Sequence, residues 1–219
     1  RRCKQSRAIL IDNGHSIEYV KQWIPRKYHH RVLYIQRDIN TLCADSIMEL
    51  VRQRWPDAAW DKFVHVHASP SCRSHSRADR GLSKHRGSAG QPLTELAKSD
   101  DKSCEHAIGI MLDIRRIAKN ALFTIENPES RTFLLQPCIK QLMQDSDWQL
   151  LQCSYCKCTH SMLDKGFWPR KDTFVIAAGL PPQTSLPQCD NDCEHLVDRV
   201  VQGQARRHKV VICRSSRNW

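Results

Sequence analysis

The sequence lacks long apolar runs. No stretch approaches the ~20 consecutive apolar residues that a membrane-spanning helix needs, so no such helix is predicted. The opening segment RRCKQSRAILIDNGHS holds only a four-residue apolar run, which does not fit a secretory signal peptide. Internal repeats and long low-complexity tracts are also missing. From these absences we expect an intracellular protein, with nucleus and cytoplasm both open.

Acidic residues are scarce relative to basic ones. The chain of 219 residues carries 34 Lys and Arg against 23 Asp and Glu, which gives a net charge of +11. A surplus of this size favours polyanionic partners such as nucleic acid. The apolar content of 40% is enough for a packed core, and the length favours one core with an appendage.

The eleven cysteines are odd in number and unevenly spaced. This does not match the disulfide framework of a small secreted protein. Reduced thiols are therefore the better interpretation, as metal ligands, as a nucleophile or as ordinary core residues.

Short apolar runs alternate with segments of helical periodicity. Strands are predicted over 7–12, 31–35, 62–68, 121–125, 148–155 and 173–179, and helices over 16–24, 44–55, 103–120 and 131–145. This order predicts an α/β fold with a mostly parallel sheet and helices on both faces. From about residue 180 the composition changes, so we predict a main domain over 1–180 and a small Cys/His-rich segment with a final strand over 181–219.

Four polar loops follow predicted strands, namely 12–16, 38–45, 69–72 and 126–128. Ligands of such sheets bind beyond the carboxyl ends of the strands. Cys72 lies in one of these loops, where a thiol can reach a substrate, and Arg73 and His75 beside it favour the thiolate. Glu126 lies in another. The alternatives are that Cys72 simply packs and that Glu126 is a helix-start acid before Pro128.

At these residues the sequence resembles the cytosine-C5 methyltransferases that use S-adenosylmethionine. Ser69-Pro70-Ser71-Cys72 is similar to the family's nucleophile motif, a strand that ends in Ser-Pro-Pro-Cys. Glu126-Asn127-Pro128 is similar to its Glu-Asn motif, and Gly166-Phe167-Trp168-Pro169-Arg170-Lys171-Asp172-Thr173 is similar to its arginine-bearing motif. The order is the family's order, and the run from Ser154 to Thr173 looks closest to compact phage- and virus-type members.

The resemblance implies a Rossmann-like class I methyltransferase fold and a covalent mechanism on DNA, with RNA left open. Cys72 would attack C6 of a flipped cytosine, and Glu126 would hold N3 and the exocyclic amine. Arg170 would keep Glu126 and the base in place.

The resemblance also implies a set of residues that bind S-adenosylmethionine. Asp38 follows the second predicted strand, where an acid accepts hydrogen bonds from ribose hydroxyls, and Asp45 lies where the family places an acid near the adenine amine. These two acids are equally explained as a helix cap and a first-turn acid. The full expected set is Asp12, Gly14, Asp38, Asp45, Ser69 and Pro70.

Residues 73–91 are polar and basic, with five Arg and Lys against one Asp. Such a loop is suited to phosphate contacts. The expected nucleic-acid contacts are Arg73, His75, Arg77, Arg80, Lys84 and Arg86.

Two clusters of cysteine and histidine have zinc-like spacing. The preferred set of ligands for a structural zinc is Cys189, Cys193, His195 and His208, and the second candidate set is Cys153, Cys156, Cys158 and His160. Unpaired buried thiols are the alternative for each cluster.

The sequence departs from the family pattern at three places. Ser71 replaces a proline, Gly14 is the single glycine of the first loop, and the target-recognition region is reduced to about residues 181–208. Two alternative functions follow. One is a non-catalytic nucleic-acid-binding module on a decayed methyltransferase scaffold. The other is a zinc-dependent binding protein.

Overall fold

The structure is a computed structural model. It describes residues 6–22, 24–75, 85–154, 172–188, 195–200 and 207–212. The chain forms two compact units, of which the first comprises Arg1–Val66 and Lys102–Ala121 and the second His67–Asp101 and Leu122–Trp219. The boundary predicted at residue 180 falls inside the second unit.

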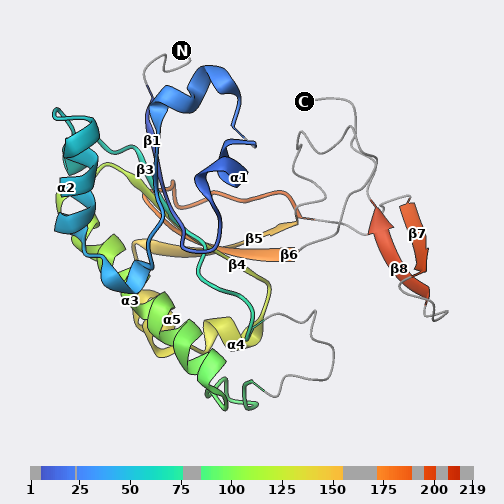
Figure 1. Cartoon of the computed structure of the whole chain (residues 1–219). Coiled ribbons are helices and arrows are strands. Elements are labelled where there is room, and N and C mark those ends of the chain that lie inside the picture. The colour runs from blue at the N-terminus through green and yellow to red at the C-terminus, as the bar shows by residue number, and fades with distance from the viewer. Residues whose placement is uncertain are drawn as a thin grey trace. The chain divides into compact units, whose positions relative to one another are not determined.

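The first unit contains a two-stranded parallel sheet. β1 (Ala8–Ile11) pairs with β2 (Val32–Ile35), from Ala8 opposite Val32 to Ile11 opposite Ile35. Both strands therefore end at the same edge, and the segments that follow them start side by side. The other elements of this unit are α1 (Ile17–Lys21), η1 (Arg26–Arg31), η2 (Ile39–Thr41), α2 (Ala44–Arg54), η3 (Trp60–Lys62) and the greater part of α3 (Glu95–Ile117) (Figure 1).

The long helix α3 begins at Glu95, eight residues before the predicted start at Ser103. Its first two turns, ELAKSDDK, are mostly polar, so the helical period of apolar residues does not reveal them. Ala97 in this segment is nonetheless fully buried. Tertiary packing therefore sets the beginning of this helix.

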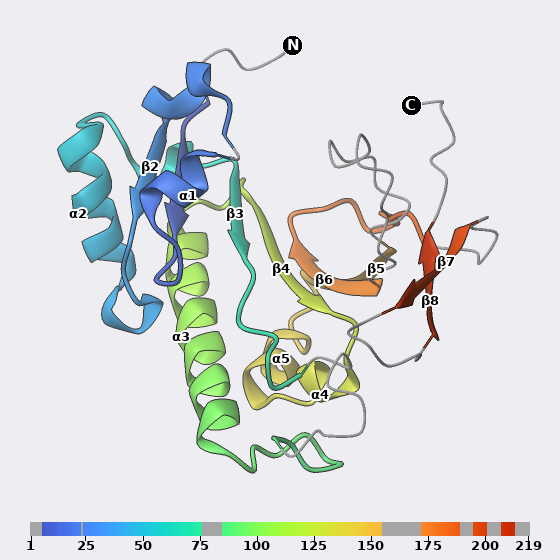
Figure 2. The same ribbon diagram turned by 45° about the vertical axis from the view of Figure 1, so that its right-hand side comes forward.

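The second unit contains a four-stranded sheet in the order β3–β4–β6–β5 (Figure 2). Its strands are β3 (His65–Ala68), β4 (Leu122–Pro128), β5 (Trp148–Ser154) and β6 (Asp172–Ala178). Three side-chain hydrogen bonds join β3, or the two residues just after it, to β4. In each bond the two residues are 57 positions apart in the sequence. A constant offset requires parallel strands. β6 is antiparallel to both its neighbours. The α/β prediction is therefore confirmed, whereas the expectation of a mostly parallel sheet is wrong for this mixed sheet.

Strand β4 is longer than predicted. The expectation that Glu126, Asn127 and Pro128 form a loop after the strand is wrong, because all three belong to β4 and pair with β6. The core around β4 is apolar and contains Phe123, Ile125, Phe133, Ile139 and Ile176, each at most 1% exposed.

The helix predicted over 131–145 is divided into α4 (Arg131–Leu134) and α5 (Pro137–Leu142). Pro137 is the reason, since proline cannot donate a backbone hydrogen bond inside a helix but suits its first position. The unit also contains a hairpin of two antiparallel strands, β7 (His195–Val200) and β8 (Arg207–Ile212). Within the described residues, no helix combines the length and the apolar character needed to cross a membrane.

Candidate active site

A buried carboxylate lies at the centre of the sheet in the second unit. Glu126 is only 8% exposed, and Ser69, directly after β3, donates its hydroxyl to Oε2 of Glu126 over 2.7 Å. Two residues earlier in each segment, Nδ1 of His67 and the hydroxyl of Thr124 form a hydrogen bond of 2.8 Å. Because side chains alternate along a strand, these four polar groups share one face of the sheet.

Asn127 fixes the chain on the other face. It is fully buried, and its Nδ2 donates to the carbonyl oxygen of Pro70 over 3.1 Å. Two consecutive residues of β4 therefore hold two consecutive residues after β3, namely Ser69 and Pro70. This double attachment fixes where the loop that carries Cys72 begins.

Cys72 lies two residues beyond Pro70 and is half-buried with a free thiol. Its carbonyl accepts a 3.0 Å bond from the backbone N–H of His75, which closes a turn. A thiol on a short anchored turn next to a strand with a buried carboxylate is suited to nucleophilic chemistry. None of the five described cysteines is in a disulfide with another described residue.

His75 is not a phosphate contact or a source of positive charge for Cys72. It is 4% exposed, bonds to Gln136 and Thr132, and meets the ring of Phe133 edge-on. Burial, and then the charge of Arg86, lower the pKa of His75 to about 4, so its ring is neutral at pH 7. Both roles predicted for His75 are therefore wrong.

The nucleic-acid contact predicted for Arg86 is wrong because this side chain is also buried. Its side chain is 1% exposed and pairs with Asp101, with the shorter N–O distance at 2.5 Å. A buried, paired guanidinium is not available to phosphates. Arg73 is exposed and stays a predicted contact. Arg77, Arg80, Lys84 and Arg170 lie outside the described residues.

The predicted cofactor residues fall into two groups. Ser69 and Pro70 belong to the second unit and make the contacts with β4 given above. The others belong to the first unit, where Asp12 and Gly14 follow β1 and Asp38 follows β2 at the same edge. Their roles toward a cofactor stay predictions.

Asp12 organises the loop after β1. Its Oδ1 accepts from the N–H of Gly14 at 2.7 Å, and its Oδ2 contacts Nδ1 of His15 at 2.6 Å. Burial raises the pKa of Asp12, but the bonds from Gly14 and His15 outweigh it and leave the pKa below its ordinary value. Tyr34 of β2 donates to the carbonyls of His15 and Asp12, which ties this loop to the second strand.

Asp38 and Asp45 also take the alternative roles considered from the sequence. Asp38 caps η2, and its Oδ1 accepts both the backbone N–H and the Nδ2 of Asn40 at 2.9 Å. Within the described part of the chain its second oxygen accepts no hydrogen bond. Asp45 is the first-turn acid of α2 and borders a depression of about 740 Å³ beside Met48 and Trp60.

The zinc prediction is not settled by the described residues. Cys189, Cys193, Cys156, Cys158 and His160 lie outside them, and His195 and His208 are described only as backbone positions of β7 and β8. Among the residues that the structure does describe, no three His, Cys, Asp or Glu side chains gather where a metal ion would bind.

Sequence reasoning missed three contributors to the site: Asn127 as an anchor, the His67–Thr124 pair, and the acids Asp100 and Asp101 of α3. The alternation of His65 and His67 along β3, which Ser69 continues directly after the strand, carries a signal for the shared face. Asp100, which is buried, and Asp101, which is partly exposed, carry no such signal, because in the sequence they resemble solvent-exposed helix residues.

No family profile matches this chain, and no curated protein matches its sequence. Two solved structures are similar over most of it. A methyltransferase of Entamoeba histolytica, EhMeth, is 13% identical with a TM-score of 0.42, covering 83% of this chain and 55% of that one. The Dnmt2 methyltransferase of S. pombe is 14% identical with a TM-score of 0.38, covering 82% and 52%. The chain thus spans about half the length of these proteins, and neither match identifies its family.

Proposed function

We propose that this chain is an S-adenosylmethionine-dependent methyltransferase that methylates C5 of cytosine in DNA. The observation that carries the proposal is the pair of bonds Ser69–Glu126 and Pro70–Asn127. Through them a cysteine-bearing loop and a buried glutamate, 54 positions apart in the sequence, meet on adjacent parallel strands. Both belong to motifs in which the sequence resembles cytosine-C5 methyltransferases.

In the proposed reaction Cys72 adds as a thiolate to C6 of a cytosine turned out of the base stack, at an unstacking cost of a few kcal/mol. Glu126 in its protonated form gives its proton to N3 and accepts a hydrogen bond from the exocyclic amine, which neutralises the negative charge that develops on the ring, and it takes the proton back when Cys72 leaves. Ser69 orients Glu126 through its hydrogen bond. With the cofactor bound, C5 would take the methyl group as its bond to the sulfonium sulfur breaks, which leaves a neutral thioether. The C5 proton then leaves to water, and the Cys72–C6 bond breaks to restore the double bond and the thiolate.

The residues of the first unit fit the cofactor in part. S-adenosylmethionine supplies an electrophilic methyl group when it is bound. The second oxygen of Asp38 suits a ribose hydroxyl, and the loop held by Asp12 lies beside it at the end of β1. The N–H of Gly14 is already bonded to Asp12, so it is not a donor for a ligand.

The occupied N–H of Gly14 also favours the second candidate, a non-catalytic nucleic-acid-binding module. Ser71 also favours this candidate, because it stands where the family motif has a second proline and so makes the loop that carries Cys72 less rigid. Such a chain binds DNA or RNA but shows no heat of binding with S-adenosylmethionine in calorimetry.

The test is transfer of label from radiolabelled S-adenosylmethionine to duplex DNA and, separately, to RNA. Cys72→Ser should abolish transfer, whereas Cys43→Ser makes the same chemical change at an exposed thiol and should retain it. Glu126→Gln should lower kcat on the order of 100-fold. Transfer of label to DNA by the Cys72→Ser variant would refute Cys72 as the nucleophile. Label in RNA alone would show that RNA is the substrate instead of DNA. Binding of nucleic acid without transfer of label would favour the non-catalytic binding module.

A further inference from the structure

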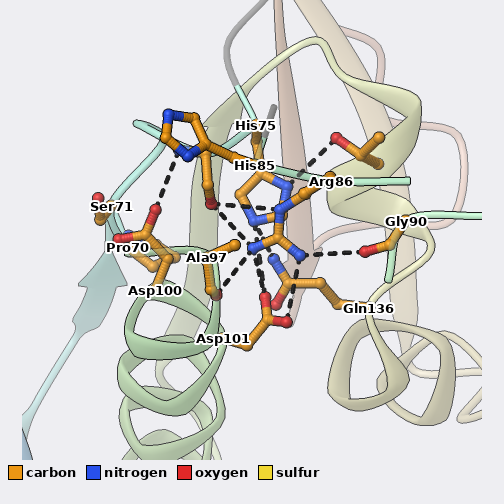
Figure 3. A network of polar contacts seen from close by, with 12 residues as sticks. Pro70, Ser71, His75, His85, Arg86, Gly90, Ala97, Asp100, Asp101 and Gln136 are labelled. Carbon is orange, nitrogen blue, oxygen red and sulfur yellow. Dashed lines mark hydrogen bonds and ion pairs between the residues drawn. The ribbon is translucent and has the colours of Figure 1, made fainter. Parts of the chain in front are cut away.

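A buried polar cluster lies beside the loop that carries Cys72 and is centred on Arg86 (Figure 3). Both oxygens of Asp101 accept from its guanidinium, at 2.5 and 3.1 Å. The hydroxyl of Ser74 accepts from Nη2 at 2.9 Å and from Nε at 3.2 Å, and the carbonyls of Gly90 and Ala97 accept at 3.1 and 3.2 Å. Each guanidinium nitrogen therefore donates inside the protein.

These bonds hold the chain just after Cys72. Ser74 is 5% exposed, and besides its contact with Arg86 it donates its backbone N–H to Asp100 at 3.0 Å. His75 is fixed by Gln136 and Thr132 and closes the turn onto the carbonyl of Cys72. The loop is thus attached at both ends, by β4 before Cys72 and by the Arg86 cluster after it.

The ion pair joins an Arg86 side chain that is 1% exposed to an Asp101 side chain that is 25% exposed, and a largely buried pair of this kind is an expensive way to stabilise a protein. The desolvation of both charges can exceed their attraction, and apolar residues of the same volume often serve as well or better. A guanidinium, however, holds several acceptors in one fixed planar arrangement. Arg86 uses this property to fix Ser74 relative to the first turns of α3, which an apolar side chain cannot do.

We propose that Arg86, together with Asp101, is a positioning residue that holds the Cys72 loop in its reactive geometry. Neither side chain touches a reacting atom. Their action passes through Ser74 to the turn that carries the thiol. The inference rests on the proposed methyl transfer for its catalytic meaning, whereas the attachment of the loop is tested independently of it.

The decisive variant is Asp101→Asn, which keeps the shape of the side chain and removes its charge. Its matched control is Asp113→Asn, on the same helix, where the aspartate pairs with Arg116 at the surface. Arg86→Met removes the guanidinium, and Arg86→Lys restores a single charge that can reach Asp101 but cannot hold all four acceptors. If Arg86→Met does not fold, the Asp101→Asn and Arg86→Lys variants still decide the question.

Two readouts separate positioning from general stability. The first is alkylation of the native protein by iodoacetamide, resolved by mass spectrometry for each cysteine. We expect Cys72 to react at least threefold faster in Asp101→Asn, because its turn is released. Cys43 is an internal control, since it is exposed and its pKa is lowered by the side chain and backbone of Ser46. Its rate should not change.

The second readout is methyl transfer. We expect kcat at least tenfold lower in Asp101→Asn, KM values for cofactor and DNA within twofold, and kcat for Arg86→Lys above that for Arg86→Met. A lower melting temperature with unchanged Cys72 alkylation and unchanged kcat would overturn the proposal. If the unmodified protein transfers no methyl group, the proposed function fails. Alkylation of Cys72 then still decides whether Arg86 and Asp101 hold the loop.

Discussion

Replacing Asn127 by aspartate should destabilise the protein in a strongly pH-dependent way. The side chain of Asn127 is fully buried and donates to the carbonyl of Pro70 over 3.1 Å. Asn127→Asp preserves its shape but replaces the donor by a carboxylate oxygen that faces a carbonyl oxygen. A buried carboxylate without a partner takes up a proton, and the protonated form can again donate to Pro70.

The cost of protonation sets the expected magnitude. An ordinary aspartate has a pKa of about 3.9, and each pH unit corresponds to about 1.4 kcal/mol. Asn127→Asp should therefore lower the free energy of unfolding by about 4 kcal/mol at pH 7 and by about 1.5 kcal/mol at pH 5. The sign follows because the pKa of the introduced carboxyl is higher in the folded state. The folded state then binds more protons, and the deficit shrinks as the pH falls.

Urea unfolding of the unmodified protein and the variant at pH 7, 6 and 5 measures this deficit directly. Asn120→Asp, the same change at an exposed position after α3, should stay within about 0.5 kcal/mol at every pH. A deficit for Asn127→Asp that does not change with pH would refute the buried hydrogen bond to Pro70 as the anchor of the loop that carries Cys72.

Two further predictions concern charge. Because the pKa of His75 is about 4 when folded and about 6.5 when unfolded, the folded state excludes a proton and stability is lost as the pH falls through this range. Between pH 7.5 and pH 5 the free energy of unfolding should drop by about 2 kcal/mol more than in His75→Gln, and equal drops in urea titrations would contradict this. The net charge of +11 predicts that log Kobs for duplex DNA falls linearly with log salt concentration. In fluorescence anisotropy, Arg73→Ala should reduce this slope by about one, and a slope that stays the same would exclude Arg73 as a phosphate contact.

The sequence was most informative where local rules decide the structure. Runs rich in apolar residues identify β1, β2, β5 and β6 to within one or two residues at either end, because short runs of this kind suit a pleated strand even where it is only half-buried. It was least informative where tertiary contacts override the local pattern. The beginning of α3 and the inclusion of Glu126 in β4 both depend on packing partners that are distant in the sequence.

For the candidate site, the sequence by itself determined which groups are proposed to carry the chemistry: the thiol of Cys72, the carboxylate of Glu126 and a surplus of positive charge. The order of these motifs also sufficed to propose a reaction. Residue type and spacing determine these features, and both can be read along the chain.

Only the tertiary structure decided how those groups are held. It showed that Ser69 and Pro70 bond to consecutive residues of β4, and that Arg86 and His75 are buried parts of the loop's support instead of surface contacts. A basic residue looks the same in a sequence whether it is surrounded by water or is buried and paired with an aspartate. Burial and partners, which set its charge and its role, arise only when distant segments pack together.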